Sequence, residues 1–382
     1  MANLNLSPSI ARLDFGQEIV FSPPPWIRSH SGWFVNGIPG GNDRLGRVDP
    51  NGLYTAPSDA GDGIEVTIGL RVSGPRRRWC YATVLVGETG EGFYRYRGYQ
   101  PLSGSEGFGL KEAHAIAVNI DGRILVADPI LSVIATFDQD SGELTPFVKH
   151  REGDILDGPR DVEVGADGRV YVADGNNGLI RVFSQEGILL YTFGESKTGE
   201  RLKRPHSVAV DEEGNVYVAD VDASKIYAYD RDGQLLRSWG GPGGQRGHFL
   251  APHGVAVDPN GDIFVAEYDG RCQKFTPDGE LVTVFANEGL GKDQDHGERR
   301  YHTLTCDHLG NVYLMSRIFG KTHMITVDKY NNDGVFVTSF CPPLSRPFPF
   351  GCQDAAVSSS GRVYVADTWK RMSGFSTFDP AR

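Results

Sequence analysis

Histidine recurs at one position of a motif that is repeated along the chain. The segments PHSVAVDEEGNVYVAD, from Pro205, and PHGVAVDPNGDIFVAE, from Pro252, are close copies. Four more segments align with them, beginning at Ala113, Pro159, Tyr301 and Cys352. The second position of the six segments holds, in chain order, His114, Arg160, His206, His253, His302 and Gln353. Imidazole can bind a metal ion or act as a general acid or base, so this position is the first candidate for chemistry.

The repeat predicts the fold that positions these side chains. Each segment contains an alternating strand such as SVAV, a glycine turn such as DEEG and a second strand such as NVYVAD. Glycine supplies the positive φ that a tight hairpin needs. Third and fourth strands follow, such as KIYAYD and QLLRSWG. Four antiparallel strands every ~45 residues are the blade of a β-propeller. We therefore expect an all-β protein with a six-bladed propeller over residues 89–382.

The two ends of this region are expected to meet. The last segment stops after a third strand, in FSTFDPAR, whereas GFYRYRG at residues 92–98 resembles a fourth strand. Pairing of 92–98 with the last blade would close the ring and remove an open sheet edge. The pattern P-x-G/S-V-A-V-D…G-x-V-Y-V-A-D resembles NHL repeats over about three quarters of the chain. That resemblance implies a propeller and leaves its function open.

In a propeller the first strand of each blade lines the central channel, so the second positions should converge at one mouth. Three imidazoles can hold Zn²⁺ and leave a position for water or substrate. Alternate blades supply His114, His206 and His302, which is the first choice of metal ligands, with Zn expected and Fe as an alternative. His253 is either a fourth ligand or a substrate-facing acid or base, and Arg160 is expected to bind a carboxylate or an oxyanion.

A propeller with three channel histidines from alternate blades resembles peptidyl-α-hydroxyglycine α-amidating lyase, which uses zinc to activate a hydroxyl and split a C–N bond. The motif at Pro205 has the same form. The chain departs from that family in having His253 and in lacking a match to its cysteine-bridged loops. The tyrosine that the resemblance implies has three candidates here: Tyr94, Tyr268 and Tyr301.

Acidic residues end the second strand of most segments. The six positions are Asp128, Asp174, Asp220, Glu267, Ser316 and Asp367. They are interpreted as caps of the turn that follows the strand. The alternative is that they orient the imidazoles from behind or bind a structural Ca²⁺.

Residues 1–88 lie outside the repeat and are expected to form a small immunoglobulin-like β-sandwich. The segment WFVNGIPGGNDRLGRVDPNGLYTAP is rich in turn residues, and IEVTIGLRV alternates as a strand does. This wording resembles bacterial immunoglobulin-like modules, which implies a spacer or docking role, a possible protein partner and an extracytoplasmic setting. The first residues show no signal-peptide pattern, so the compartment stays open.

Composition excludes several classes of function. The net charge is −11, which disfavours nucleic acid and anionic membrane surfaces, and no apolar run approaches the length of a membrane helix. The five cysteines are scattered without a CxxC, which argues against a disulfide framework and a thiolate zinc site.

Two classes of function remain for the chain. The first is a metal-dependent lyase or hydrolase that acts on a small-molecule or peptide-derived substrate at the channel mouth. The second is a non-enzymatic module that recognises a protein or glycan through its loop-rich face. An iron oxygenase with four histidine ligands is a third, weaker alternative.

Overall fold

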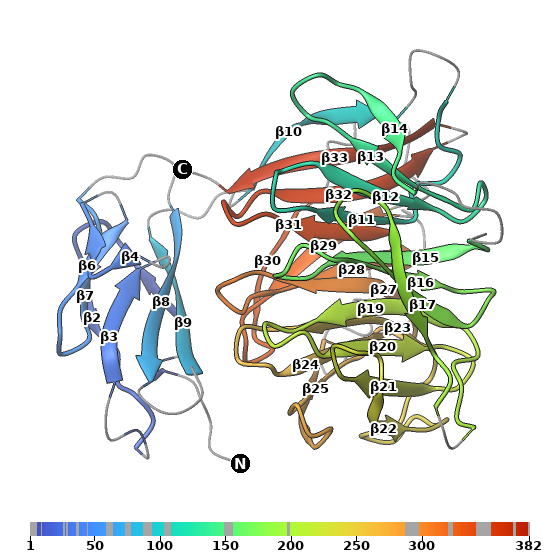
Figure 1. Cartoon of the computed structure of the whole chain (residues 1–382). Helices are drawn as coiled ribbons and strands as arrows, with labels where there is room; N and C mark the ends of the chain where they lie inside the picture. The colour runs from blue at the N-terminus through green and yellow to red at the C-terminus, as the bar shows by residue number, and fades with distance from the viewer. Residues whose placement is uncertain are drawn as a thin grey trace.

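The computed structural model is built from β-strands in two regions (Figure 1). It describes residues 6–8, 10–25, 27, 30–35, 38–43, 45–58, 64–72, 78–86, 94–102, 108–148, 156–196, 199–286, 298–319, 324–340, 353–369 and 372–380. Over these residues no helix is both long and apolar enough to cross a membrane.

The N-terminal region contains two sheets that share one hydrophobic core. The first sheet has the order β1-β9-β8-β3-β4, with strands β1 (Ile10–Leu13), β3 (His30–Val35), β4 (Ile38–Pro39), β8 (Ile64–Val72) and β9 (Arg78–Val86). The second has the order β2-β7-β6-β5, with strands β2 (Glu18–Val20), β5 (Gly41–Asn42), β6 (Gly46–Val48) and β7 (Leu53–Thr55). Trp33, Tyr54 and Ile68 are buried between them, so this region has a core of its own.

The repeat region forms six four-stranded antiparallel sheets within the described residues, and we call them the first to sixth units. The first unit is made of β11 (Ala115–Val118), β12 (Ile124–Asp128), β13 (Val133–Phe137) and β14 (Leu144–Pro146). The second is made of β15 (Pro159–Val164), β16 (Val170–Asp174), β17 (Leu179–Phe183) and β18 (Leu189–Phe193). The third is made of β19 (Pro205–Val210), β20 (Val216–Asp220), β21 (Lys225–Tyr229) and β22 (Leu235–Gly240). In each of them the strands pair in chain order.

The fourth and fifth units follow the same order, and the sixth takes one strand from before the repeat. The fourth unit is made of β23 (Pro252–Val257), β24 (Ile263–Glu267), β25 (Cys272–Phe275) and β26 (Leu281–Phe285). The fifth is made of β27 (Glu298–Cys306), β28 (Val312–Phe319), β29 (Met324–Tyr330) and β30 (Phe336–Phe340). The sixth is made of β31 (Asp354–Val357), β32 (Val363–Trp369), β33 (Met372–Pro380) and β10 (Tyr94–Pro101). β10 pairs antiparallel with β33, from Tyr94 opposite Pro380 to Pro101 opposite Gly374. Gly92 and Phe93, which begin the segment expected to close the ring, lie outside the described residues.

The first strands of the six units form a closed circle. β11, β15, β19, β23, β27 and β31 each contact the next, and β31 contacts β11 again. Buried side chains of neighbouring units pack between the sheets, for example Tyr171 of the second unit with Val208 of the third. Because these strands surround one axis, residues at the same position of different units come together there although they are far apart in sequence.

Candidate metal site at the ring axis

In four of the six units, the second residue of the motif lies at an interruption of strand pairing. In the second, third and fourth units the register shifts around this residue, for example between Pro205 and Ser207. In the fifth unit the shift spans His302 and Thr303. A β-bulge leaves a residue out of the ladder and redirects its side chain. In the first and sixth units the ladder has no shift and begins one residue later, at Ala115 and Asp354, so His114 and Gln353 precede it.

Three of the predicted metal ligands meet at the axis. One ring nitrogen each from His114, His206 and His302 lies within 4.8 Å of the other two. The ring centroids are 5.4 to 5.5 Å apart, and all three residues are buried. An equilateral triangle with 4.8 Å edges has its centre about 2.8 Å from each corner, so sub-ångström movements would bring the nitrogens to the ~2.0–2.1 Å of a Zn–N bond.

Each of these histidines is oriented by a carbonyl of the next unit. The Nδ1 atoms of His114, His206 and His302 lie 2.7, 2.9 and 2.8 Å from backbone carbonyl oxygens. The acceptors belong, in the same order, to Arg160, His253 and Gln353. A carbonyl only accepts, so Nδ1 carries the proton and the lone pair is on Nε2. This is the tautomer and the outer-shell contact typical of metal-binding histidine.

Electrostatics favours neutral imidazoles in this cluster. Burial, together with the neighbouring His253, His302 and His114, holds the pKa of His206 well below its usual value, against a smaller opposing effect of its bond to the carbonyl of His253. A neutral imidazole is the form that binds a metal ion. The donor set and its protonation therefore fit a divalent cation with a preference for nitrogen ligands, such as Zn²⁺.

His253 lies beside the three histidines and is not part of the convergent group found among the described residues. Its ring centroid is 4.4 Å from that of His206 and 5.3 Å from that of His302. It also stacks on Tyr268, with centroids 4.9 Å apart and an interplanar angle of 29°. The guanidinium of Arg300 lies over the other ring of this stack, 5.2 Å from the Tyr268 centroid. His253 and Tyr268 thus form an aromatic wall on one side of the site.

The structure separates the three tyrosine candidates. Tyr268 packs against His253, whereas Tyr301 is fully buried and directs its hydroxyl to Asp328 and Tyr330 of its own unit. The Tyr94 hydroxyl lies 2.8 Å from that of Tyr313, away from the histidines. Tyr268 is the only one of the three that adjoins the site.

Arg160 contributes to the site in two ways. Its carbonyl accepts from His114, and its side chain runs over Gly175, where an added Cβ would lie 2.7 Å from the Arg160 Cγ. The Arg160 Nε is buried and has no hydrogen-bond partner among the described residues. A buried guanidinium N–H without a partner is available for an anionic group of a ligand.

The acidic residues at the ends of the second strands bind the backbone that leads to each second position. Asp128 accepts the amides of Lys111 and Glu112, at 2.6 and 2.9 Å. Equivalent bonds join Asp157 to Asp174, Lys203 to Asp220 and Leu250 to Glu267, and in each of these four units the amide is three residues before the second position. These bonds fix the approach to the second position. The expected caps of the following turn are separate bonds, which Asp128 accepts from Ile130 and Leu131 and Asp220 accepts from Ala223.

The fifth unit holds the segment before its histidine in a different way. Ser316 stands at the cap position, and its hydroxyl is buried without a partner among the described residues. Here β27 begins at Glu298, and residues Glu298 to Tyr301 pair directly with β28. Strand pairing thus replaces the carboxylate as the support of His302. Nothing is described for the side chain of Asp367 in the sixth unit.

Sequence reasoning missed a set of channel residues at the third position. This position holds Ala115, Asp161, Ser207, Gly254, Thr303 and Asp354. Two units have aspartate at this position, where the others have a small residue or a hydroxyl residue, and this difference was the signal in the sequence. It marks a polar layer that borders the histidines.

Comparison with known proteins supports the fold of this region. Residues 99–287 match the family model described as "SMP-30/Gluconolactonase/LRE-like region". A solved structure described as a putative gluconolactonase is 14% identical, with a TM-score of 0.54 over 75% of this chain and 92% of that one. A streptogramin B lyase is 12% identical, with a TM-score of 0.48, and the match covers 75% of this chain and 98% of that one. Virginiamycin B lyase from Staphylococcus aureus is also 12% identical with a TM-score of 0.48, and the match covers 71% of this chain and 81% of that one. No curated protein matches the chain. The repeat region is therefore an all-β fold of the propeller type.

Proposed function

We propose that the chain is a metal-dependent lyase or hydrolase, built as a six-bladed propeller closed by β10 and preceded by an immunoglobulin-like module. The observation that carries the proposal is the convergence of His114, His206 and His302 with every Nδ1 bonded to a carbonyl. Zinc is the expected ion, because three neutral imidazoles with room for a further ligand are typical of catalytic zinc sites. Iron is the alternative ion.

The roles of the residues follow from their positions. The three histidines would hold the metal ion, which would supply Lewis-acid polarisation of a carbonyl or hydroxyl oxygen. Arg160 would bind a negatively charged group through its buried Nε, and the wall of His253 and Tyr268 would contact the apolar part of the substrate. His253 is also placed to accept or donate a proton beside the histidines. We propose an extracytoplasmic setting and a docking role for the N-terminal module on the resemblance alone.

The substrate class follows from the family model. Because the model that matches residues 99–287 is named for gluconolactonase, a cyclic ester is the first substrate to assay, ahead of α-hydroxy amides. Hydrolysis of a lactone releases one proton for each ring opened, which a pH-stat records without a chromophore. The other classes of substrate can be compared in the same instrument or by chromatography.

The direct test is the metal content of untagged protein. We expect about one equivalent of Zn per chain. That metal should be lost when His206 and His302 are replaced by Ala. Absence of stoichiometric Zn, Fe, Mn or Cu from protein that also fails to bind added Zn²⁺ would overturn the proposal.

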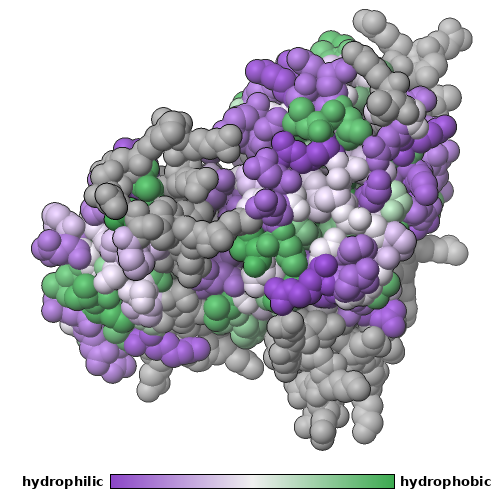
Figure 2. Space-filling view, turned by 90° about the horizontal axis from the view of Figure 1, so that it is seen from below, coloured by the Kyte–Doolittle hydropathy of each residue, from purple (hydrophilic) through white to green (hydrophobic). Residues whose placement is uncertain are grey.

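A recognition module is the second candidate, and one surface observation favours it. The outer strands of the second to fourth units expose Leu190, Leu236 and Val282 at the same position, with 47%, 49% and 41% of each residue accessible. Figure 2 shows hydrophobic residues on one face as separate patches among hydrophilic ones. If recognition is the function, replacing His206 and His302 by Ala leaves partner binding intact, whereas replacing Leu190 and Leu236 by Asp abolishes it.

A further inference from the structure

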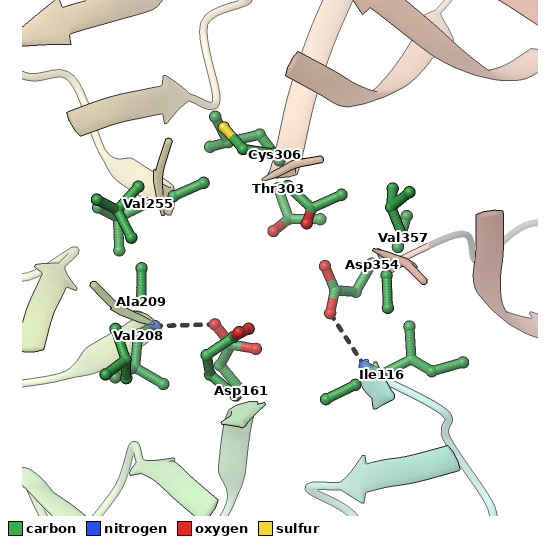
Figure 3. Close-up of a pocket in the computed structure, with 18 of the residues that line it drawn as sticks. Ile116, Asp161, Val208, Ala209, Val255, Thr303, Cys306, Asp354 and Val357 are labelled. Carbon is green, nitrogen blue, oxygen red and sulfur yellow. Dashed lines mark hydrogen bonds between the residues drawn. The ribbon is translucent and has the colours of Figure 1, made fainter. Parts of the chain in front are cut away.

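The channel beyond the histidines contains a partly open cavity of about 130 Å³. It is lined by the first strands of all six units, so it continues along the ring axis from the third position of the motif onwards. Figure 3 shows Asp161, Asp354 and Thr303 directed into this space from different units, with Val208, Val255 and Ile116 around them. Most of the lining residues are apolar by type, but the surface that they present to the cavity is mainly polar.

Carboxylates are the charged groups that face this cavity. Asp161 and Glu163 come from the same face of β15, and Asp354 comes from β31. β27 contributes the Cys306 thiol with Thr303 and Thr305, while β11, β19 and β23 contribute no titratable group to the lining. No Lys, Arg or His is among the lining residues, so nothing described there balances the negative charge.

Two of the carboxylates are held in place by neighbouring units. Asp161 accepts the amide of Val208 at 2.8 Å, and Asp354 accepts the amide of Ile116 at 3.0 Å (Figure 3). Both amides belong to the first strand of the following unit. Asp161 also accepts the amide of its chain neighbour Val162 at 2.8 Å through its other oxygen. The carboxylates are therefore fixed parts of the ring.

Burial makes ionisation of this cluster costly. It raises the pKa of Asp161 to about 6, and the pKa of Glu163 to about 8 with a further contribution from the charge of Asp161. The pKa of Asp354 is raised as well, by burial first and then by Asp161. The three groups influence one another, as closely spaced carboxylates do.

Two hydroxyl groups hydrogen bond the carboxylates, and each belongs to the residue that follows a histidine of the site in the chain. Ser207 directly follows His206 and hydrogen bonds Asp161, and Thr303 directly follows His302 and hydrogen bonds Asp354. In the first unit the residue after His114 is Ala115, which offers no hydroxyl. Two of the three histidines are therefore followed in the chain by a hydroxyl residue that contacts a carboxylate of the cavity.

We propose that this cavity is an internal proton store for the histidine site, in which Asp161, Glu163 and Asp354 share protons that Ser207 and Thr303 conduct to and from the histidine face. The inference rests on the proposed function for the use of the proton, while the store itself exists without a bound metal ion. In one transfer, the O–H bond of a carboxylic acid breaks and its proton goes to the hydroxyl oxygen of Ser207 or Thr303. That hydroxyl gives its own proton to an acceptor on the histidine face, and a carboxylate is left behind. The reverse sequence stores a proton that the substrate releases.

Infrared spectroscopy of the metal-free protein tests the store. At pH 7 we expect the C=O stretch of a buried carboxylic acid, part of which is lost on titration to about pH 9 because Glu163 then ionises. Glu163→Gln should remove the part that is lost between pH 7 and pH 9, and Asp161→Asn should lower the pH of that loss because a neighbouring negative charge is removed. Asp211→Asn is the matched control, since Asp211 is also buried but binds Asn215 and Tyr217. A wild-type spectrum without carboxylic acid at pH 7 would overturn the proposal.

Exchange of the stored proton tests the connection. After transfer into D₂O, the shift of the band reports how fast the cavity proton exchanges with solvent. We expect exchange at least several-fold slower in the Ser207→Ala, Thr303→Val double variant than in wild type. An unchanged rate with the band still present would refute conduction through the hydroxyls. Metal analysis is independent of both measurements, so a failed metal site and a failed proton store give different results.

Discussion

The Nδ1 atom of His206 lies 2.9 Å from the backbone carbonyl oxygen of His253, the residue at the same position in the next unit. The same relationship joins His114 to Arg160 and His302 to Gln353. Three histidines and three carbonyls thus alternate around the axis. The residues of the even units orient the ligands through their backbone, which leaves their side chains available for other roles.

This alternation predicts different effects of alanine at neighbouring histidines. His206→Ala removes a proposed ligand, and we expect zinc affinity to fall by more than the ~10–100-fold that loss of an outer contact costs. His253→Ala keeps the carbonyl, so zinc affinity should stay within a few-fold of wild type. Competition with a chromophoric chelator measures both constants. Equal losses in the two variants would show that His253 is itself a ligand.

The carboxylates that bind the approach to the histidines give a second prediction. In Asp220→Asn the charge that accepts the amides of Lys203 and Arg204 is lost. We expect unfolding free energy to fall by ~1–3 kcal/mol and zinc affinity by ~10-fold, because the backbone before His206 is no longer held. Denaturant titration and chelator competition measure the two effects.

Ser316→Ala is the matched control for that variant. Ser316 stands at the cap position of the fifth unit, and its buried hydroxyl has no partner among the described residues. Its removal should leave zinc affinity unchanged and stability equal or higher. A loss of affinity as large as that of Asp220→Asn would mean that the position matters for a reason other than the carboxylate.

The repeated part of the fold could be predicted from the sequence. Strand alternation and glycine turns recur every 46 to 51 residues, so the four-stranded sheets and the convergence of His114, His206 and His302 followed from one alignment. The reason is that a repeat converts sequence position into spatial position. An equivalent residue in each unit must occupy an equivalent place around the axis.

Features that depend on a departure from the repeat in a single unit could not be predicted from the sequence. The carbonyl acceptors carry no side-chain signal, since any residue type provides a backbone oxygen. The long β27–β28 hairpin replaces the cap in the fifth unit, and only the pairing of Glu298 with Phe319 reveals it. Asp161 and Asp354 stand where the other units have a small or a hydroxyl residue. The cavity that surrounds these two carboxylates forms only when the ring closes.

Gly175 gives a prediction about Arg160 that leaves Arg160 itself unchanged. A Cβ at Gly175 would lie 2.7 Å from the Arg160 Cγ and 3.0 Å from the carbonyl oxygen of Gly158. In Gly175→Ala the arginine must therefore move, and we expect substrate KM to rise about tenfold, which corresponds to ~1.4 kcal/mol of lost binding, while zinc affinity is kept.

The control is Gly244→Ala, where the added Cβ meets only the Leu250 side chain at 3.5 Å. KM and zinc affinity should both match wild type there. If Gly175→Ala leaves KM unchanged and its fold is intact, Arg160 does not bind the substrate.

The cavity carboxylates predict how stability depends on pH. The pKa values of Asp161 and Glu163 in the folded protein, about 6 and about 8, exceed their ordinary values of 3.8 and 4.5. The folded state therefore binds more protons than the unfolded state between about pH 4 and pH 8, and stability falls as pH rises through this range. The penalty is absent below about pH 4 and complete above about pH 8.

Glu163→Gln removes the larger part of this dependence, because glutamine carries no charge at any pH. We expect the loss of unfolding free energy between pH 5 and pH 9 to be ~2–4 kcal/mol smaller in this variant than in wild type. Denaturant titrations at a series of pH values, with Asp211→Asn as the control for a buried carboxylate outside the cavity, measure the difference. Parallel pH curves for wild type and Glu163→Gln would show that Glu163 is already ionised at neutral pH, and its charge would then have to be balanced by a cation within the channel.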